Sequence, residues 1–298
     1  EERVAATLPR LEQMLRLGTT TAEVKTGYGL DLASELKMLD VIAALDMAQP
    51  IDLVPTFMPA HAIPPQFNGR SAAYIEQVMR EMIPAAAEWY KNSQFRQDGR
   101  PLFCDVFCEK NAFTLDQSRQ VLAAGLAYGL PAKIHADEFT SLGGVGLAVD
   151  LGATYVDQLE APSPQAIALL ANADVVAILL PAVNFNLGSY DFAPARQLID
   201  AGAVVALSTD INPGSAPCPS QPLVMALAAR YQRLLPAEAL NAATINAAFG
   251  VGLGERIGSL QPGKQADLLL LNCHDYREVV YQFGGNLVES VFKNGRKI

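Results

Sequence analysis

The sequence repeats one pattern along most of its length, in which a short apolar stretch of strand length is followed by an amphipathic stretch of helical length. Near-continuous runs of Val, Ile and Leu are typical of strands covered on both faces. Seven such stretches are predicted to be strands: residues 20–26, 51–58, 102–110, 131–136, 154–160, 175–182 and 204–210. Helical patterns occupy residues 34–47, 71–89, 115–128, 143–151, 163–173, 192–201, 221–233 and 236–249. Strict alternation of strands and helices predicts an α/β fold with a parallel sheet.

The number of repeating units favours a (β/α)8-type TIM barrel with seven of its eight βα units visible. Such a barrel commonly takes about 250 residues, which leaves room for an appendage in a chain of 298. The chain opens inside a helical pattern without an initiating methionine, so we expect residues 1–252 to form a barrel missing its first βα unit. Residues 253–298 contain short strand patterns separated by turn residues. They are expected to be the C-terminal part of a small β-sandwich domain.

The composition argues against several classes of function. Half of the residues are hydrophobic and 18% are charged, which is unlike a disordered chain. A net charge of −9 and a pI near 4.9 disfavour nucleic acid or an anionic membrane surface as a partner, because both need clustered Lys and Arg. No apolar run reaches the roughly 18 residues of a membrane span, and no signal-peptide pattern begins the chain. We therefore expect a cytoplasmic protein that acts on a small molecule.

The cysteines form no pattern typical of disulfides or zinc fingers. Cys104 and Cys108 would lie roughly 13 Å apart on one strand, which is too far for a disulfide. We expect all four cysteines to be reduced and mostly structural.

Titratable residues appear where two of the predicted strands end. In LPAKIHADEF, residues 130–139, the apolar run stops at His135, Asp137 and Glu138, and VVALSTD ends in Asp210. The catalytic groups of a β/α barrel lie at the C-terminal ends of its strands. His135 and Asp210 are therefore candidate ligands of one divalent ion with a position left open for water. The alternative for His135 is a packed core histidine or a hydrogen-bonded cap.

Glu138 lies three residues beyond His135, where it can face the same cavity without binding the metal. A carboxylate in this place could carry a proton between water and a substrate nitrogen. Helix capping and a solvated loop charge are the alternatives, and the spacing alone does not decide between them.

Three loops after strands offer candidate substrate contacts. His61 follows the strand at 51–58 in a loop stiffened by two prolines. Tyr28 lies between two glycines that permit a backbone turn toward the cavity. Asp210 is followed by a polar turn, residues 212–215, whose amides and hydroxyl could hold a ligand. The alternatives are a turn histidine bonded to its own backbone and a simple turn aromatic, and His274 is expected on the surface.

The chain contains, in this order, EVKTGYGLD, AHAIPP, DVFCEKNAF, KIHADE, LGG at 142–144, LLPA, STDINPGSAP, ATINAA and IGSLQPGKQADL. From residue 17 to the end this series resembles the imidazolonepropionase family, amidohydrolases of histidine degradation. The resemblance implies a barrel with a split β domain, one zinc or iron ion and a homodimer. It also implies hydrolysis of the cyclic amide C–N bond of 4-imidazolone-5-propanoate to N-formimidoyl-L-glutamate.

The resemblance assigns roles to the candidate residues. His135 and Asp210 correspond to metal ligands, and Glu138 corresponds to the acid/base that contacts the imidazolone ring. Asp210 joins Glu138 in handling protons during catalysis. The remaining correspondences are substrate contacts: Tyr28, His61, Asn212, Gly214 and Ser215.

Two departures from the family bear on activity. The family's other two metal ligands form a His-x-His pair at the end of the first barrel strand, and this region, with an arginine and further substrate contacts, is missing here. Catalytic zinc generally needs about three protein ligands. Relatives usually have Asp-His-Leu-Glu where this chain has Asp157-Gln158-Leu159-Glu160. Glutamine can donate a hydrogen bond but cannot transfer a proton at neutral pH.

Three hypotheses about function follow from these features. The first is an imidazolonepropionase without its N-terminal portion. The second is a related cyclic amidohydrolase whose ring substrate is altered because Gln158 replaces the histidine. The third is a non-catalytic, metal-free module that binds a small acid or a partner.

Overall fold

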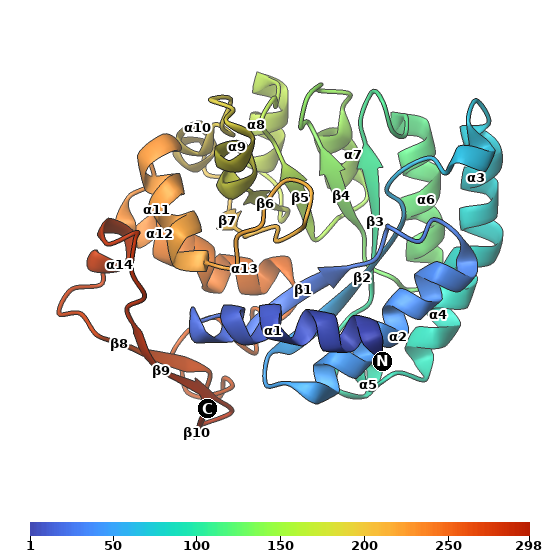
Figure 1. Cartoon of the computed structure of the whole chain (residues 1–298). Coiled ribbons are helices and arrows are strands. Elements are labelled where there is room, and N and C mark those ends of the chain that lie inside the picture. The colour runs from blue at the N-terminus through green and yellow to red at the C-terminus, as the bar shows by residue number, and fades with distance from the viewer.

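The computed structural model describes residues 1–298, which form one curved parallel sheet, the helices around it and a small antiparallel sheet (Figure 1). The large sheet has seven strands that follow one another in chain order. The strands are β1 (Thr21–Lys25), β2 (Asp52–Ala60), β3 (Phe103–Cys108), β4 (Lys133–Ala136), β5 (Tyr155–Gln158), β6 (Val176–Leu179) and β7 (Val205–Leu207). All seven predicted strands and the parallel sheet are confirmed. The sheet is open, because β1 and β7 are its two edges and do not pair.

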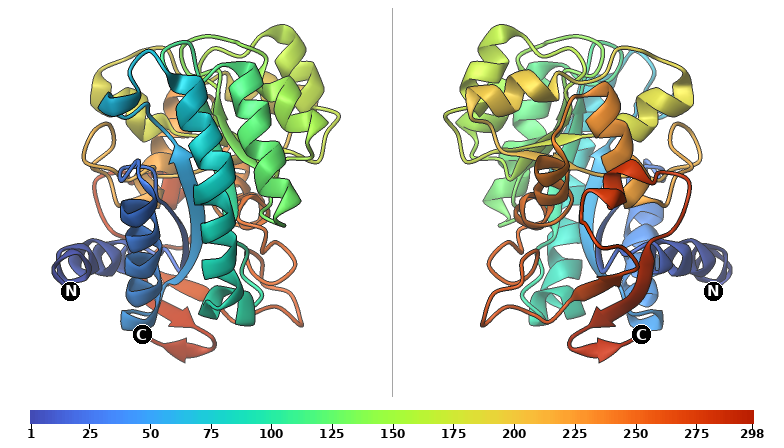
Figure 2. Two further views of the ribbon diagram at one scale, coloured as in Figure 1. Left: turned by 90° about the vertical axis from the view of Figure 1, so that its right-hand side faces the viewer. Right: turned by 90° about the vertical axis from the view of Figure 1, so that its left-hand side faces the viewer.

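Helices lie along the outer side of this sheet (Figure 2). The first elements are α1 (Glu2–Arg16), α2 (Leu32–Ala48), η1 (Pro65–Phe67), α3 (Ser71–Gln77), η2 (Val78–Met82), α4 (Ile83–Lys91), α5 (Gln94–Gln97), α6 (Leu115–Ala127) and α7 (Gly144–Asp150). They are followed by α8 (Pro164–Leu170), α9 (Pro181–Leu187), α10 (Ala195–Ala201), α11 (Gln221–Tyr231), α12 (Pro236–Ala243) and α13 (Ile245–Gly250). Every predicted helix is present.

Two helical details differ from the sequence prediction for reasons of local chemistry. The predicted helix at 71–89 contains the π-helical turn η2 directly before Pro84, which has no N–H for a regular helical hydrogen bond. The strand predicted at 175–182 ends at Leu179, and Pro181 begins α9, which the sequence analysis missed. A continuous apolar run does not by itself distinguish a buried strand from a buried helix.

The C-terminal segment forms a three-stranded antiparallel sheet in the order β10-β9-β8. Its strands are β8 (Leu268–Leu271), β9 (Val288–Lys293) and β10 (Arg296–Lys297), and α14 (Glu278–Tyr281) lies between the first two. The predicted short strands are therefore confirmed, whereas α14 was not predicted. The cysteines form no disulfide, as expected, and His274 is exposed. None of the helices combines the length and apolar character needed to cross a membrane.

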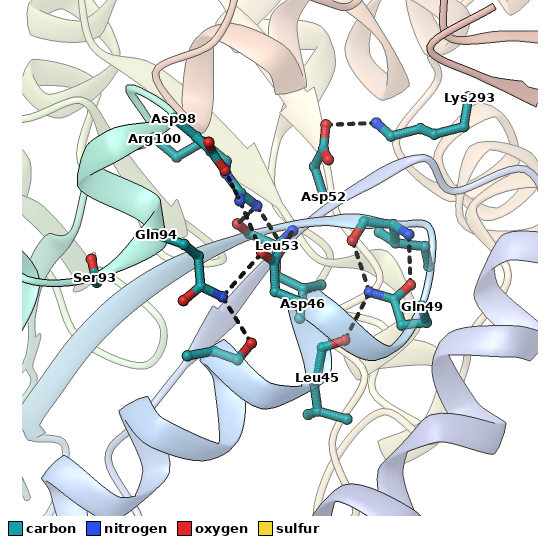
Figure 3. Close-up of polar contacts among 12 residues, drawn as sticks. Leu45, Asp46, Gln49, Asp52, Leu53, Ser93, Gln94, Asp98, Arg100 and Lys293 are labelled. Carbon is teal, nitrogen blue, oxygen red and sulfur yellow. Dashed lines mark hydrogen bonds and ion pairs between the residues drawn. The ribbon is translucent and has the colours of Figure 1, made fainter. Parts of the chain in front are cut away.

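A buried lysine ties this small sheet to the large one. The Nζ atom of Lys293 on β9 lies 2.7 Å from Oδ2 of Asp52 at the start of β2 and 2.6 Å from Oδ2 of Asp267, and only 4% of the Lys293 side chain is exposed. Figure 3 shows this contact beside a second network, in which Arg100 bridges Asp46 and the carbonyl of Leu53. The N-terminal end of β2 is therefore held by charged groups from distant parts of the chain.

We expect Lys293→Met to lower the free energy of unfolding by about 3–5 kcal/mol near neutral pH, because it leaves two carboxylates without their cation. Burial alone would raise the pKa of Asp52, but hydrogen bonds from Lys293 and Gln265 outweigh it and hold the pKa below its usual value. A lowered carboxyl pKa stabilises the fold above the unfolded-state value and loses that contribution as pH falls through the folded-state pKa. The difference between the two proteins in urea denaturation should therefore shrink in acid.

Arg296→Met is the matched control, because Arg296 is an exposed cation of the same hairpin. Equal losses of stability in the two variants would contradict the proposed tie.

Candidate active site

The register of the parallel strands brings His135 next to two aspartates. His135 on β4 pairs with Asp157 on β5 and with Phe107 on β3. Asp105 lies two residues before Phe107, so it shares the same face of β3. The Nδ1 atom of His135 lies 3.2 Å from Oδ1 of Asp105 and 3.2 Å from Oδ1 of Asp157. None of these three side chains has more than a small exposed fraction.

Below His135 the interior of the sheet holds further charges that pair with one another. The Nζ atom of Lys25 lies 2.6 Å from Oδ2 of Asp105 and 3.1 Å from Oδ2 of Asp157. The Nζ atom of Lys133 lies 2.9 Å from Oε1 of Glu23 and packs over the rings of Phe103 and Tyr155. We call the following set the interior charge cluster: Glu23, Lys25, Asp105, Lys133, His135, Tyr155 and Asp157.

Opposite charges decide the direction of the pKa shifts of His135 and Glu23, whereas burial decides that of Lys133. Burial alone would lower the pKa of His135, but Asp105 and Asp157 outweigh it and raise the pKa to about 9. Burial would raise the pKa of Glu23, but the two lysines lower it to about 2. The pKa of Lys133 falls to about 8 because its burial outweighs the attraction of Glu23. The cluster is therefore held together by ion pairs rather than by neutral hydrogen bonds alone.

Glu138 follows β4 in a loop that a second glutamate fixes in place. The pKa of Glu138 is raised to about 7, first by burial and further by the charges of neighbouring carboxylates, against the opposing effect of His135. Oε2 of Glu109 accepts hydrogen bonds from the backbone N–H groups of Phe139 at 2.9 Å and Thr140 at 3.1 Å. A carboxyl group with a pKa near 7 in a fixed loop suits proton transfer at neutral pH.

Asp210 lies three residues beyond the end of β7 and is partly buried. Its pKa is raised to about 6, first by burial, while His135 acts in the opposite direction. Nδ2 of Asn212 donates to the Asp210 carbonyl at 2.7 Å, and Oδ1 of Asn212 accepts from the N–H groups of Gly214 at 2.8 Å and Ser215 at 2.7 Å. The predicted ligand-binding loop is therefore a turn closed by its own asparagine.

Tyr28 and His61 lie in contact with each other after β1 and β2. Their ring centroids are 5.0 Å apart, and Phe107 continues the contact from His61 at 6.3 Å to His135 at 6.1 Å. Nδ1 of His61 lies 2.9 Å from the carbonyl oxygen of Gly27. Gly27 has a φ of 108°, and a Cβ atom there would lie 2.8 Å from the Met58 carbonyl oxygen, so the turn requires glycine. The two candidate substrate contacts thus reach His135 through one line of rings.

The segments that follow β4 to β7 contain strained backbone and unpaired atoms. Asp137, Gln158, Leu159 and Asp210 have φ values of 56°, 77°, 67° and 47° although none is glycine. Such conformations cost about 1–3 kcal/mol each and tend to occur at functional sites. Several buried oxygen atoms in this region have no hydrogen-bond partner; they belong to Asp137, Gln158, Glu160 and Asn184. Unpaired buried acceptors at a strained rim are typical of a site that binds a ligand.

The structure also identifies residues that the sequence analysis did not select. Lys25, Asp105 and Glu109 contact candidate residues or hold their loops. They lie within the segments EVKTGYGLD and DVFCEKNAF, but the sequence assigned them no role. Apart from these segments, their signal is a charged residue inside or at the end of an apolar strand pattern. Such a residue is buried with a partner if it is buried at all.

Two sets of side chains could take part in holding a metal ion. The potential ligand atoms of Asp105, His135 and Asp157 lie within 4.8 Å of one another. However, the ammonium group of Lys25 already forms an ion pair with each of the two carboxylates. The other candidate set is the second ring nitrogen of His135 with the carboxylate of Asp210, which lies outside the three-residue group. These two donors suit a divalent ion in type, and catalytic zinc usually has about three protein ligands.

Sequence comparisons find close relatives over the whole chain. Residues 112–298 match the Amidohydrolase family. The imidazolonepropionase of Chloroflexus aggregans is 56% identical over 297 residues, which are 100% of this chain and 70% of that protein. The imidazolonepropionase of Herpetosiphon aurantiacus is 52% identical over 297 residues, 100% of this chain and 69% of that protein. The imidazolonepropionase of Streptococcus pyogenes serotype M3 is 44% identical over 286 residues, which are 96% of this chain and 66% of that protein.

Solved structures share the fold at low sequence identity. Guanine deaminase of E. coli superposes with a TM-score of 0.74 at 17% identity, over 100% of this chain and 75% of that chain. Adenosine deaminase of Xanthomonas campestris, solved with bound zinc, gives a TM-score of 0.71 at 20% identity, over 99% of this chain and 69% of that chain. A triazine hydrolase superposes with a TM-score of 0.76 at 16% identity, over 99% of this chain and 71% of that chain. These similarities concern the fold alone.

We expect Glu109→Ala to release the loop after Glu138, because two backbone donors lose their charged acceptor. Hydrogen bonds to charged groups contribute about 1.5–3 kcal/mol, so hydrogen exchange at Phe139 and Thr140 should speed up about tenfold or more. Lys110→Ala, at the exposed neighbouring position, should leave the exchange unchanged. Equal exchange rates in the wild-type protein and Glu109→Ala would contradict this role.

Proposed function

Because this chain belongs to the imidazolonepropionase family of amidohydrolases, we propose that it hydrolyses the cyclic amide C–N bond of 4-imidazolone-5-propanoate, yielding N-formimidoyl-L-glutamate in histidine degradation. The observation that carries the proposal is the rim formed after β4 and β7, where the charge of His135 lowers the pKa values of both Glu138 and Asp210 against the effect of their burial. Identities of 52–56% to imidazolonepropionases over the whole chain support the same activity.

We also propose the finer architecture. Residues 1–252 form a TIM-type barrel with seven βα units, and residues 253–298 form part of a small β-sandwich domain. The free edges of β1 and β7 support the first part, because an eighth strand between them would close the barrel. The family resemblance supports a cytoplasmic homodimer.

His135 and Asp210 would hold the metal ion, which we propose to be a single zinc or iron. When bound, such an ion polarises the ring carbonyl and makes water a better nucleophile. The closed turn at Asn212 fixes the position of Asp210, and Asp105 fixes the ring of His135. Both donors are therefore oriented by contacts within this chain.

Glu138 moves the proton in the proposed reaction. Water adds to the ring carbonyl carbon, and the carboxylate of Glu138 takes a proton from it. As the C–N bond breaks, Glu138 delivers that proton to the leaving ring nitrogen. The carbon side leaves as a carboxylic acid, which loses its remaining proton to solvent at neutral pH to give the carboxylate. A pKa near 7 lets Glu138 accept and release this proton at neutral pH. Asp210, with a pKa near 6, assists at the same rim.

Substrate binding is assigned to the loops around this rim. Tyr28 is 65% exposed, so its hydroxyl is free to contact substrate. His61 has one ring nitrogen against Gly27 and offers the other. The N–H of Gly214 and the hydroxyl of Ser215 belong to the turn that Asn212 closes, which places the polar groups of this loop beside Asp210.

One observation favours a second candidate, a cyclic amidohydrolase with a different ring substrate. Oε1 of Gln158 is buried without a partner at the strained end of β5, where relatives usually have histidine. A metal-free binding module is the third candidate. Stoichiometric zinc or iron in protein purified without chelators would contradict it.

We expect Glu138→Gln to lower kcat for ring opening about 10²–10⁴-fold, because glutamine keeps the shape of the side chain but cannot carry the proton. The measurement is the loss of imidazolonepropionate absorbance by protein supplied with zinc or iron. Glu255→Gln, at an exposed position, is the control and should retain full activity. An unimpaired Glu138→Gln enzyme would remove Glu138 from the mechanism.

We expect Gln158→His to raise kcat for imidazolonepropionate by up to about 10²-fold, because it restores a side chain able to share a proton. Hydantoins and cyclic ureas should be assayed beside it. If the wild-type protein prefers a ring without the propionate group, the second candidate function replaces the first.

A further inference from the structure

The polar contacts of the His135 ring lie at its Nδ1 atom. Its Nδ1 atom faces the carboxylates of Asp105 and Asp157, each at 3.2 Å. The ring edge contacts Phe107 in a T-shaped arrangement with centroids 6.1 Å apart. An imidazole whose Nδ1–H donates to a carboxylate has a fixed orientation and a fixed tautomer when neutral.

The accepting carboxylate is itself held from several directions. Asp105 has no exposed side-chain surface. Its Oδ1 also accepts from the backbone N–H of Val106 at 2.7 Å, and its Oδ2 accepts from the Lys25 ammonium at 2.6 Å. Lys25 reaches Asp157 as well, at 3.1 Å. The carboxylate therefore cannot rotate away from His135 without breaking two other bonds.

We propose that Asp105, supported by Lys25 and Asp157, is a positioning residue that accepts the Nδ1 proton of His135 and so leaves Nε2 as the nitrogen offered to the metal ion. The proposal rests on the proposed function for the metal role of His135, whereas the hydrogen bond itself is independent of it. Carboxylate partners of this kind orient metal-binding imidazoles and raise their basicity.

The same geometry argues against the alternative that Asp105, His135 and Asp157 bind a metal ion together. A divalent cation among them would lie beside the Lys25 ammonium, which already contacts both carboxylates. If a metal ion displaced the Lys25 ammonium from Asp105 and Asp157, the ammonium would lose its ion-pair partners in the sheet interior, which costs several kcal/mol. The three residues therefore act as a support for one ligand.

The decisive experiment is a long-range ¹H–¹⁵N spectrum of the protein labelled with ¹⁵N-histidine. The chain has three histidines, so His135→Gln and His61→Gln assign the imidazole signals. We expect His135 to show a proton on Nδ1, shifted downfield by its carboxylate partner and slow to exchange with solvent. His61→Gln should leave the His135 signal in place. The Nδ1 atom of His61 faces the carbonyl oxygen of Gly27 and takes no part in the contacts of His135 with carboxylates.

Asp105→Asn tests the partner. We expect the Nδ1 proton signal to move upfield or vanish, and zinc affinity, measured by competition with a chelator, to fall about 10–100-fold. Asp150→Asn, which removes an exposed carboxylate, should change neither. If Asp105→Asn does not fold, the wild-type spectrum still tests whether Nδ1 of His135 carries the proton.

The possible outcomes separate this inference from the proposed function. A His135 that is protonated on Nε2 alone, or a signal that Asp105→Asn leaves unchanged, overturns the inference. Absence of zinc binding by wild-type protein that nevertheless shows the Nδ1 signal overturns the metal role of His135 in the proposed function and leaves the hydrogen bond standing.

Discussion

The pairing of buried lysines with buried carboxylates is the constraint on which the rest of this structure depends. Lys25 and Lys133 project into the sheet interior from β1 and β4, where a lone ion would cost several kcal/mol. Three carboxylates, from β1, β3 and β5, surround them. The pairs Lys25–Asp105, Lys25–Asp157 and Lys133–Glu23 link different strands, so they favour the register that brings these opposite charges together. The apolar side chains around these ions provide close packing, whereas the ion pairs align the strands with one another.

His135 joins this interior cluster to the rim above it. Its Nδ1 side belongs to the ion pairs, and its charge lowers the pKa values of Glu138 and Asp210 against the effect of their burial. A change in the charges below the rim is therefore expected to alter the protonation of Glu138 and Asp210. The interior charge cluster thus acts electrostatically on the residues proposed to touch the substrate, although it lies beneath them.

The strands and the rim residues could be predicted from the sequence because their signals are local. Parallel strands buried on both faces give uninterrupted apolar runs, and His135 and Asp210 appear where such runs end. The roles of Asp105 and Lys25 were missed because they depend on which strands come together in space. No short sequence segment predicts the ion pairs between side chains of β1, β3 and β5. Asp157 was noticed only as part of a motif, and its contact with His135 follows from strand register.

The two sides of the rim differ in how completely their polar groups are paired. After β7, Asn212 uses both its oxygen and its nitrogen to close the turn around Asp210. After β5, Gln158 and Glu160 keep buried oxygens unpaired on a strained backbone. A closed turn holds its shape with or without a ligand, whereas unpaired acceptors gain free energy only when a donor arrives. The turn after β7 is therefore fixed by its own hydrogen bonds, whereas the segment after β5 keeps acceptors that a bound donor could satisfy.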